Sequence, residues 1–206
     1  MYKITKEITA KSFWKNFCEA LEGNVNAIQN VWNNKSAFTE FIIKNVFNSI
    51  LHDKYEYEDK HQYEYLKIDL IGWKELDKSE LGAIPKNFES YFWAFDVAIE
   101  HENDKEKWMD EVIKLSYINC PLRIVIGYAP RNMQEEYLSY VSKALQILNR
   151  EYQSIRESQE FMIILGDSGL DGKDVSIENY TPYVYDCDCN EQCFKEGKVY
   201  WAQRSN

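Results

Sequence analysis

Three acidic residues form the pattern in this sequence that most clearly suggests chemistry. Asp69 lies within a run rich in Leu and Ile, and Glu100 and Glu102 are two residues apart at the end of a second apolar run. A carboxylate among apolar residues is costly to bury unless it is paired, hydrogen-bonded or bound to a metal ion. Residues two apart on a strand share one face of a sheet, so we expect Glu100 and Glu102 to point the same way.

Several carboxylates at one place repel one another, and a divalent cation removes that repulsion. Hard oxygen ligands favour Mg²⁺ or Mn²⁺, and such an ion can hold a phosphodiester, activate water and stabilise the leaving oxygen. The pattern therefore predicts a metal site formed by Asp69, Glu100 and Glu102. The alternative is that the acidic stretch from Asp96 to Glu111 is a solvated rim of the sheet.

The segments around these residues alternate between strand-like and helix-like patterns. Residues 62–73 and 91–102 are rich in aromatic and β-branched side chains, which is typical of strands. We expect the two strands to pair antiparallel, with Asp69 beside Glu100. Further along the chain, the apolar spacing predicts a helix over 104–119, a buried strand over 122–128, a helix over 132–156 and a strand over 161–165. Such alternation predicts an α/β domain with a mixed central sheet.

We expect residues 1–206 to form a single domain with additions at both ends of its core. The core is predicted to span about residues 36–165. A helix over 10–22, ended by Gly23, precedes it. Residues 166–206 are expected to form a polar, irregular tail that contains short strands at 182–186 and 198–202.

The order of these elements resembles the PD-(D/E)XK nuclease superfamily, which includes many restriction endonucleases. A helix is followed by a strand with Asp69, a strand that ends in IEHEN, the helix EKWMDEVIKLSYI and the strand PLRIVIGY. The resemblance covers about residues 36–130. It implies a restriction-endonuclease-like fold, which is a mixed central sheet flanked by helices. It also implies Mg²⁺- or Mn²⁺-dependent hydrolysis of nucleic acid, with Asp69 as the motif Asp and Glu100 as the motif acid.

Glu102 stands where the superfamily usually has a lysine that orients the attacking water. Lys114, on the following helix, and Lys67, on the same strand as Asp69, are the candidates to replace it. Lys114 is the first choice because it can reach over the end of the strand that bears Glu102. Glu40 matches the acidic residue that some members place on the preceding helix. The implied catalytic residues are Asp69, Glu100, Glu102, Lys114 and Lys67, and the implied metal ligands are Asp69, Glu100, Glu102 and Glu40.

The composition leaves a second function open. The chain has 206 residues, of which 24 are basic and 34 acidic, giving a net charge of −10, and 15% of its residues are aromatic. An acidic surface repels phosphate backbones at long range. A non-catalytic acidic module on the same fold, resembling an immunity or antitoxin protein that covers a basic partner, suits this charge and the missing lysine. The expected partner is therefore nucleic acid if the protein is catalytic and another protein if it is not.

The remaining features concern location and cysteine chemistry. No apolar run approaches the roughly 18–20 residues of a membrane span, and the segment MYKITKEITAKSFW lacks the apolar stretch of a signal peptide. We therefore expect a cytoplasmic protein without a membrane partner. Cys187, Cys189 and Cys193 offer three possible zinc ligands with no fourth ligand close by in the sequence, and we interpret them as ordinary free cysteines.

Overall fold

The structure of the protein is a computed structural model. It describes residues 2–4, 8–47, 50, 55–57, 67–75, 93–104, 106–152, 155–168, 176–189 and 193–204. Its helices are α1 (Ala10–Val31), α2 (Lys35–Phe41), the π-helix η1 (Ile42–Phe47), α4 (Trp108–Ser116), the short 3₁₀ helix η4 (Arg131–Met133), α5 (Gln134–Tyr152), the 3₁₀ helix η6 (Ile177–Asn179) and α6 (Gly197–Gln203). Its strands are β1 (Tyr2–Ile4), β2 (Tyr55–Tyr57), β3 (Leu70–Glu75), β4 (Trp93–His101), β5 (Leu122–Ala129), β6 (Glu160–Asp167), β7 (Tyr180–Tyr185) and β8 (Phe194–Glu196).

The strands of the described residues form one mixed sheet of eight strands in the order β2-β1-β3-β4-β5-β6-β7-β8. Strands β4, β5 and β6 are parallel to one another, and β3 and β7 pair antiparallel on either side of them. Strand β5, at the centre of this group, is buried along its whole length. Both faces of such a strand must be covered, which explains its continuous apolar sequence LRIVIGYA.

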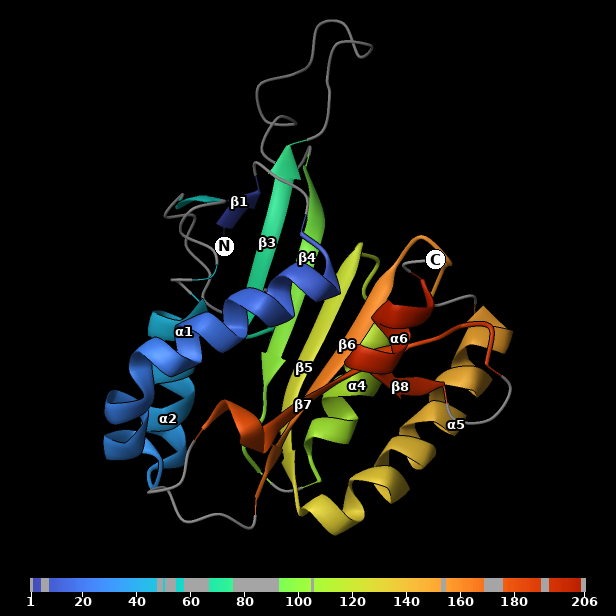
Figure 1. The fold of residues 1–206 in the computed structure, drawn as a ribbon. Helices are drawn as coiled ribbons and strands as arrows, with labels where there is room; N and C mark the ends of the chain where they lie inside the picture. The colour runs from blue at the N-terminus through green and yellow to red at the C-terminus, as the bar shows by residue number, and fades with distance from the viewer. Residues whose placement is uncertain are drawn as a thin grey trace, which may run out of the picture.

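Helices cover the two faces of the sheet. In Figure 1, α1 and α2 lie on one face, whereas α4 and α5 lie on the other. The first face carries a core in which Phe13 and Phe17 of α1 pack with Ile124 and Ile164 of the sheet. The core of the opposite face is built around Trp108 of α4, together with residues of α5. Strand residues therefore belong to one core or the other by simple alternation.

The predicted strand pairing is confirmed. Strands β3 and β4 are adjacent and antiparallel, with Leu70 opposite Ile99, and β4 is parallel to β5 with helix α4 between them in the chain. The predicted strand over 62–73 is described from residue 67 onward, and its ladder begins at Leu70. Residues 62–66, and residues 91–92 of the second predicted strand, lie outside the described residues.

The predictions for the two ends of the chain need correction. Helix α1 begins at Ala10 as predicted but continues through Gly23 to Val31. Its capping box is formed by Thr9 and Ser12, and burial of Ile28 on the core face explains why the helix continues past the glycine. The tail is not irregular, because β7 and β8 extend the sheet and α6 packs on β7. The strand predicted at 182–186 is confirmed by β7, whereas 198–202 lies in α6 and is helical.

The fold is therefore α/β, with a mixed central sheet flanked by helices. Within the described part of the chain, no helix combines the length and the hydrophobicity that crossing a bilayer requires.

Candidate active site

The antiparallel pairing of β3 with β4 brings Asp69 and Glu100 together. Asp69 comes directly before β3, and Glu100 lies one residue before the end of β4. The backbone N–H of His101 donates to Asp69 Oδ2 at 2.8 Å, and a side-chain hydrogen bond joins Asp69 to Glu100. Glu100 is only 3% exposed. The two carboxyl groups thus form a pair at the end of β4 that is largely withdrawn from solvent.

Lys114 of α4 reaches the same carboxyl pair. Its Nζ lies 2.7 Å from Glu100 Oε1, and it also forms an ion pair with Glu111, which is three residues earlier on the helix. The amine donates to the backbone carbonyl of Lys67 at 3.0 Å. Glu100 Oε1 makes its ion pair without a well-directed hydrogen bond. Since 34% of the Lys114 side chain is exposed, the amine connects a buried carboxyl group to solvent.

Burial and mutual repulsion shift the pKa values of this cluster. Burial, followed by the charge of Asp69, raises the pKa of Glu100 to about 8, although Lys114 opposes the shift. Burial also raises the pKa of Asp69, against the opposing hydrogen bonds from His101 and Glu100. Burial alone lowers the pKa of Lys114, but hydrogen bonds to Glu100 and Glu111 raise it above its usual value. At neutral pH the carboxyl pair therefore holds one proton in common beside a charged amine.

Asp69 also faces an open pocket of about 600 Å³ between α2, η1 and the end of β4, which we call the α2–β4 pocket. Glu102, His101 and Glu40 line the same pocket. The carboxylate of Asp69 is thus the group through which the buried Glu100–Lys114 pair meets a cavity large enough for a small ligand.

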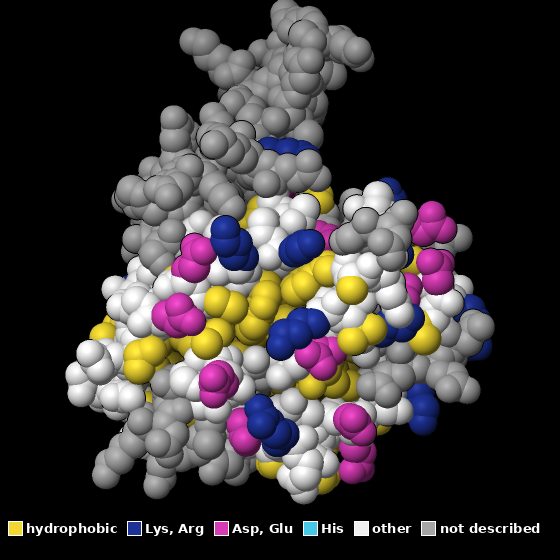
Figure 2. Space-filling model, viewed as in Figure 1, with side chains coloured by type: hydrophobic (Ala, Val, Ile, Leu, Met, Phe, Trp, Pro, Cys, Tyr) yellow, Lys and Arg dark blue, Asp and Glu magenta, His cyan; other side chains and the backbone are white. Residues whose placement is uncertain are grey.

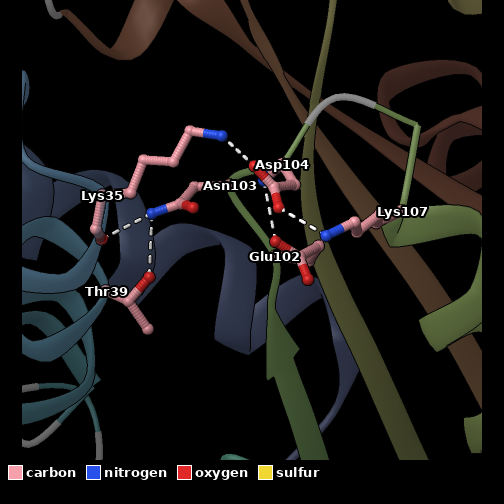
Figure 3. Close-up of polar contacts among 6 residues, drawn as sticks. All are labelled: Lys35, Thr39, Glu102, Asn103, Asp104 and Lys107. Carbon is pink, nitrogen blue, oxygen red and sulfur yellow. Dashed lines mark hydrogen bonds and ion pairs between the residues drawn. The ribbon is translucent and has the colours of Figure 1, made fainter.

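Glu102 lies in this pocket but does not join the carboxyl pair. Its Oε1 accepts a hydrogen bond from the backbone N–H of Asp104 at 2.7 Å, and Figure 3 shows this contact in the turn after β4. Strand β4 ends at His101, and the backbone N–H of Glu102 still donates to the carbonyl of Ile126 in β5 at 2.9 Å. That Glu100 and Glu102 point the same way stays a prediction.

The two remaining predicted residues lie at the edge of the site. Glu40 is exposed on α2 and paired with Lys44, whose ammonium lowers the pKa of the Glu40 carboxyl by hydrogen bonding and charge. The side chain of Lys67 is exposed, and this residue has a positive φ of 58° in the turn before β3. Lys67 contributes its backbone carbonyl to the site, as the acceptor for Lys114.

Two further residues contact the site: Glu111, which was not assigned a role from the sequence, and His101, which the sequence predicts to pack or to form hydrogen bonds on the opposite face of the strand. Glu111 shares the amine of Lys114, and the spacing of three residues on a predicted helix is the signal that indicates such a contact. His101 is buried, and its ring contacts Thr39 Oγ1 at 3.2 Å and Tyr128 Oη at 3.0 Å. Burial lowers the pKa of His101 to about 3, so its ring is neutral and packs between α2 and the sheet.

The carboxyl pair fits Mg²⁺ better than it fits a metal that needs a full set of protein ligands. Among the described residues, no group of three or more His, Cys, Asp or Glu side chains is arranged to hold a metal ion. Mg²⁺ commonly uses one or two carboxylates and completes its shell with water and substrate phosphates. Asp69 and Glu100 supply two hard oxygen ligands of that kind.

Comparison of the chain with family models, with curated proteins and with solved structures finds no match.

Proposed function

We propose that the protein is a Mg²⁺-dependent nuclease that hydrolyses phosphodiester bonds at the α2–β4 pocket. The single observation that carries this proposal is the juxtaposition of the Asp69–Glu100 carboxyl pair with the Lys114 amine at the end of β4. Two carboxylates and one ammonium supply the charges that phosphodiester hydrolysis needs: ligands for a divalent cation and a positive group for the developing negative charge. The resemblance of the sequence to the PD-(D/E)XK superfamily supports the same assignment.

The three residues take two roles in this proposal. Asp69 and Glu100 would hold Mg²⁺, which when bound would supply positive charge to the phosphate and lower the pKa of a water molecule. Glu100 must be ionised to act as a ligand, and the raised pKa of about 8 means that its proton competes with the cation at neutral pH. Lys114 provides the positive charge that a lysine in place of Glu102 would otherwise supply.

Glu102 and Glu40 take supporting roles. Both line the α2–β4 pocket, but Glu102 is held by the N–H of Asp104 and Glu40 by Lys44. We propose that they shape the entrance of the pocket. Lys67 serves through its carbonyl, which orients the Lys114 amine.

One observation favours the second candidate, a non-catalytic acidic module that binds a basic protein. Glu102 is capped by a neutral backbone donor instead of converging with Asp69 and Glu100, as a site without catalysis allows. The charge distribution in Figure 2 gives this candidate less support. On the face of the molecule that the figure shows, basic and acidic side chains of the described residues are interspersed. The excess of negative charge is not gathered there into one acidic field.

A cleavage assay with matched variants tests the nuclease proposal. Single- and double-stranded DNA and RNA are incubated with the full chain and Mg²⁺ or Mn²⁺, with EDTA as the blank. We expect Asp69→Asn and Glu100→Ala each to reduce cleavage at least about 100-fold, whereas Glu151→Ala, which removes an exposed carboxylate of α5, leaves it unchanged. Binding of Mn²⁺, followed by calorimetry, should weaken in the first two variants alone.

Two results would contradict the nuclease. Cleavage that persists in both Asp69→Asn and Glu100→Ala removes the carboxyl pair from the mechanism. Absence of cleavage on all four nucleic acids, with no Mn²⁺ binding, favours the acidic interaction module instead.

A further inference from the structure

A second pocket, of about 530 Å³, adjoins the α2–β4 pocket. The two pockets share Lys35, Asn103 and Asp104 among their lining residues. The second pocket lies beyond the ends of β4 and β5, the edge of a parallel sheet at which α/β proteins commonly bind ligands. We call it the aromatic pocket, because Trp32, Phe38 and Tyr128 line it. Its volume falls within the usual range of about 300–1,000 Å³ for small-molecule sites.

The three aromatic rings form a fixed wall. The ring centroid of Trp32 is 4.8 Å from that of Phe38 and 5.8 Å from that of Tyr128. Phe38 and Tyr128 are almost fully buried, whereas Trp32 is half-buried at the edge of the pocket. The hydroxyl of Tyr128 is anchored by His101 and Tyr180. Phe38 and Tyr128 thus fix the Trp32 ring, and a planar ligand can stack on the exposed part of Trp32 without the cost of ordering it.

Two lysines flank this wall and face one carboxylate. Figure 3 shows Lys35, from the start of α2, and Lys107, from the turn before α4, approaching Asp104 from opposite sides. Lys107 Nζ lies 2.7 Å from Asp104 Oδ2. The carboxylate of Glu102, which accepts from the N–H of Asp104, balances the second ammonium group. A phosphate would therefore bind at the mouth of the aromatic pocket by taking one lysine from its ion pair with Asp104.

One of the polar groups that line the pocket is fixed by hydrogen bonds, and another, within the described residues, has no partner. Asn103 Nδ2 donates to the carbonyl of Lys35 at 2.6 Å and to Thr39 Oγ1 at 3.0 Å, which fixes the side-chain amide. Within the described part of the chain, the buried hydroxyl of Ser168 has no hydrogen-bond partner, and Ser168 lines the pocket. An unpartnered buried hydroxyl is costly, and a ligand with a polar edge would satisfy it.

We infer that the aromatic pocket binds one unpaired nucleobase of the nucleic acid substrate, with the adjoining phosphate at Lys35 and Lys107. Aromatic side chains stack on any base, and lysines track the backbone. A base inside a duplex cannot enter such a pocket without leaving its stack. This inference rests on the proposed nuclease function, and it narrows the substrate to single-stranded or locally unpaired nucleic acid.

Binding without cleavage tests the inference. A short fluorescein-labelled single strand, its blunt duplex and its abasic analogue are titrated with the full chain in EDTA, followed by anisotropy. We expect the single strand to bind at least about tenfold more tightly than either of the other two. Trp32→Ala should weaken binding of the single strand about 5- to 150-fold, and Trp32→Phe should retain most of the wild-type affinity. Tyr152→Ala, which removes a tyrosine that is 69% exposed on α5, is the matched control.

A salt titration tests the phosphate contact separately. Lys35→Ala should lower the slope of log affinity against log salt concentration by about 0.7, the loss of one phosphate contact on a single strand. Lys143→Ala, at an exposed position of α5, should leave the slope unchanged.

The results also separate this inference from the nuclease proposal. Equal affinity for the duplex and the single strand, or unchanged affinity in a folded Trp32→Ala variant, overturns the base pocket even if cleavage occurs. Trp32-dependent binding of the single strand by a chain that cleaves nothing supports the base pocket and overturns the nuclease.

Discussion

Lys114 Nζ and Glu100 Oε1 lie 2.7 Å apart, although the two residues come from a helix and a strand on different layers of the fold. The contact places an ammonium against a carboxyl group that would otherwise be buried without a counter-ion. Glu111, three residues earlier on α4, forms a second ion pair with the same amine and fixes the lysine further. The chain thus carries, on helix α4, a positive charge at the site where its strand sequence supplies only glutamate at position 102.

Replacement of Lys114 tests the importance of this charge. Under the proposed function, Lys114→Ala should reduce cleavage at least about 100-fold, while circular dichroism and Mn²⁺ binding show a folded chain that retains its cation. Lys67→Ala should retain cleavage, because the contribution of Lys67 is its backbone carbonyl. Lys143→Ala, at an exposed position of α5, is the control variant and should leave cleavage unchanged. Equal losses in the Lys67 and Lys114 variants would show that the contact to Glu100 is not the decisive one.

The shifted pKa values predict the pH dependence of stability. The raised pKa of Glu100 means that the native chain holds this proton more tightly than the unfolded chain does. Stability should therefore fall as pH rises from about 4.5 to about 8. The lowered pKa of His101 acts in the opposite sense, since stability is lost as pH falls below 6.5. The effects of Glu100 and His101 oppose each other between pH 4.5 and 6.5, and between 6.5 and 8 the carboxyl pair of Glu100 and Asp69 acts without that of His101.

Urea unfolding in EDTA across this upper window measures the Glu100 effect. The free energy of unfolding of the wild type should fall there by up to about 1.4 kcal/mol per pH unit, the limit for one proton. Glu100→Gln, which keeps the shape of the protonated acid, should remove most of that slope. A variant with the wild-type slope would assign the proton to another group.

Two glycine substitutions should have opposite effects on stability. A methyl group at Gly127, in the middle of β5, would overlap the fully buried Trp108 side chain, so Gly127→Ala should cost about 1–3 kcal/mol or more. Gly23 lies inside α1 with open space around it, so Gly23→Ala should stabilise the chain by about 0.5–1 kcal/mol. Urea denaturation of the two variants compares them directly. A stable Gly127→Ala variant would contradict the packing of α4 on β5.

Removal of one hydroxyl tests the polar contacts beneath the aromatic pocket. Tyr128→Phe leaves the buried His101 ring without its partner at 3.0 Å and Tyr180 without its partner at 3.3 Å. The free energy of unfolding, measured by thermal or urea denaturation, should fall by about 1–3 kcal/mol. Tyr152→Phe, on the exposed end of α5, should change stability by less than about 0.5 kcal/mol.

The central elements could be predicted from the sequence because the spacing of their apolar residues indicates which side chains are buried. Strand β5 is apolar at nearly every position, and the Trp108, Val112 and Leu115 spacing of α4 matches its buried face. The pairing of Asp69 with Glu100 follows from the antiparallel arrangement of their strands. These are local patterns that tertiary packing reinforces.

The errors arose where long-range contacts override local signals. Gly23 is a common stop signal, but the packing of Ile28 continues α1 beyond it. The polar tail gains its structure by pairing with β6 and by packing against the core on the α4–α5 face of the sheet. The composition of the tail does not indicate these contacts. The hydrogen bond that Glu102 accepts from the N–H of Asp104 lies in the turn after β4, and no periodicity in the sequence indicates it.

The first turn of α1 has a consequence for how the chain is made. The backbone N–H of Ala10 donates to Glu160 Oε2 at 2.8 Å, across 150 positions of sequence, and Phe17 packs edge-on against Tyr180. On the ribosome, the first helix emerges long before either of these partners. A nascent chain that ends before β6 can cover the apolar face of α1 only in part, with η1 and β5. The rest of that face stays exposed to wrong contacts until the last quarter of the protein has been synthesised.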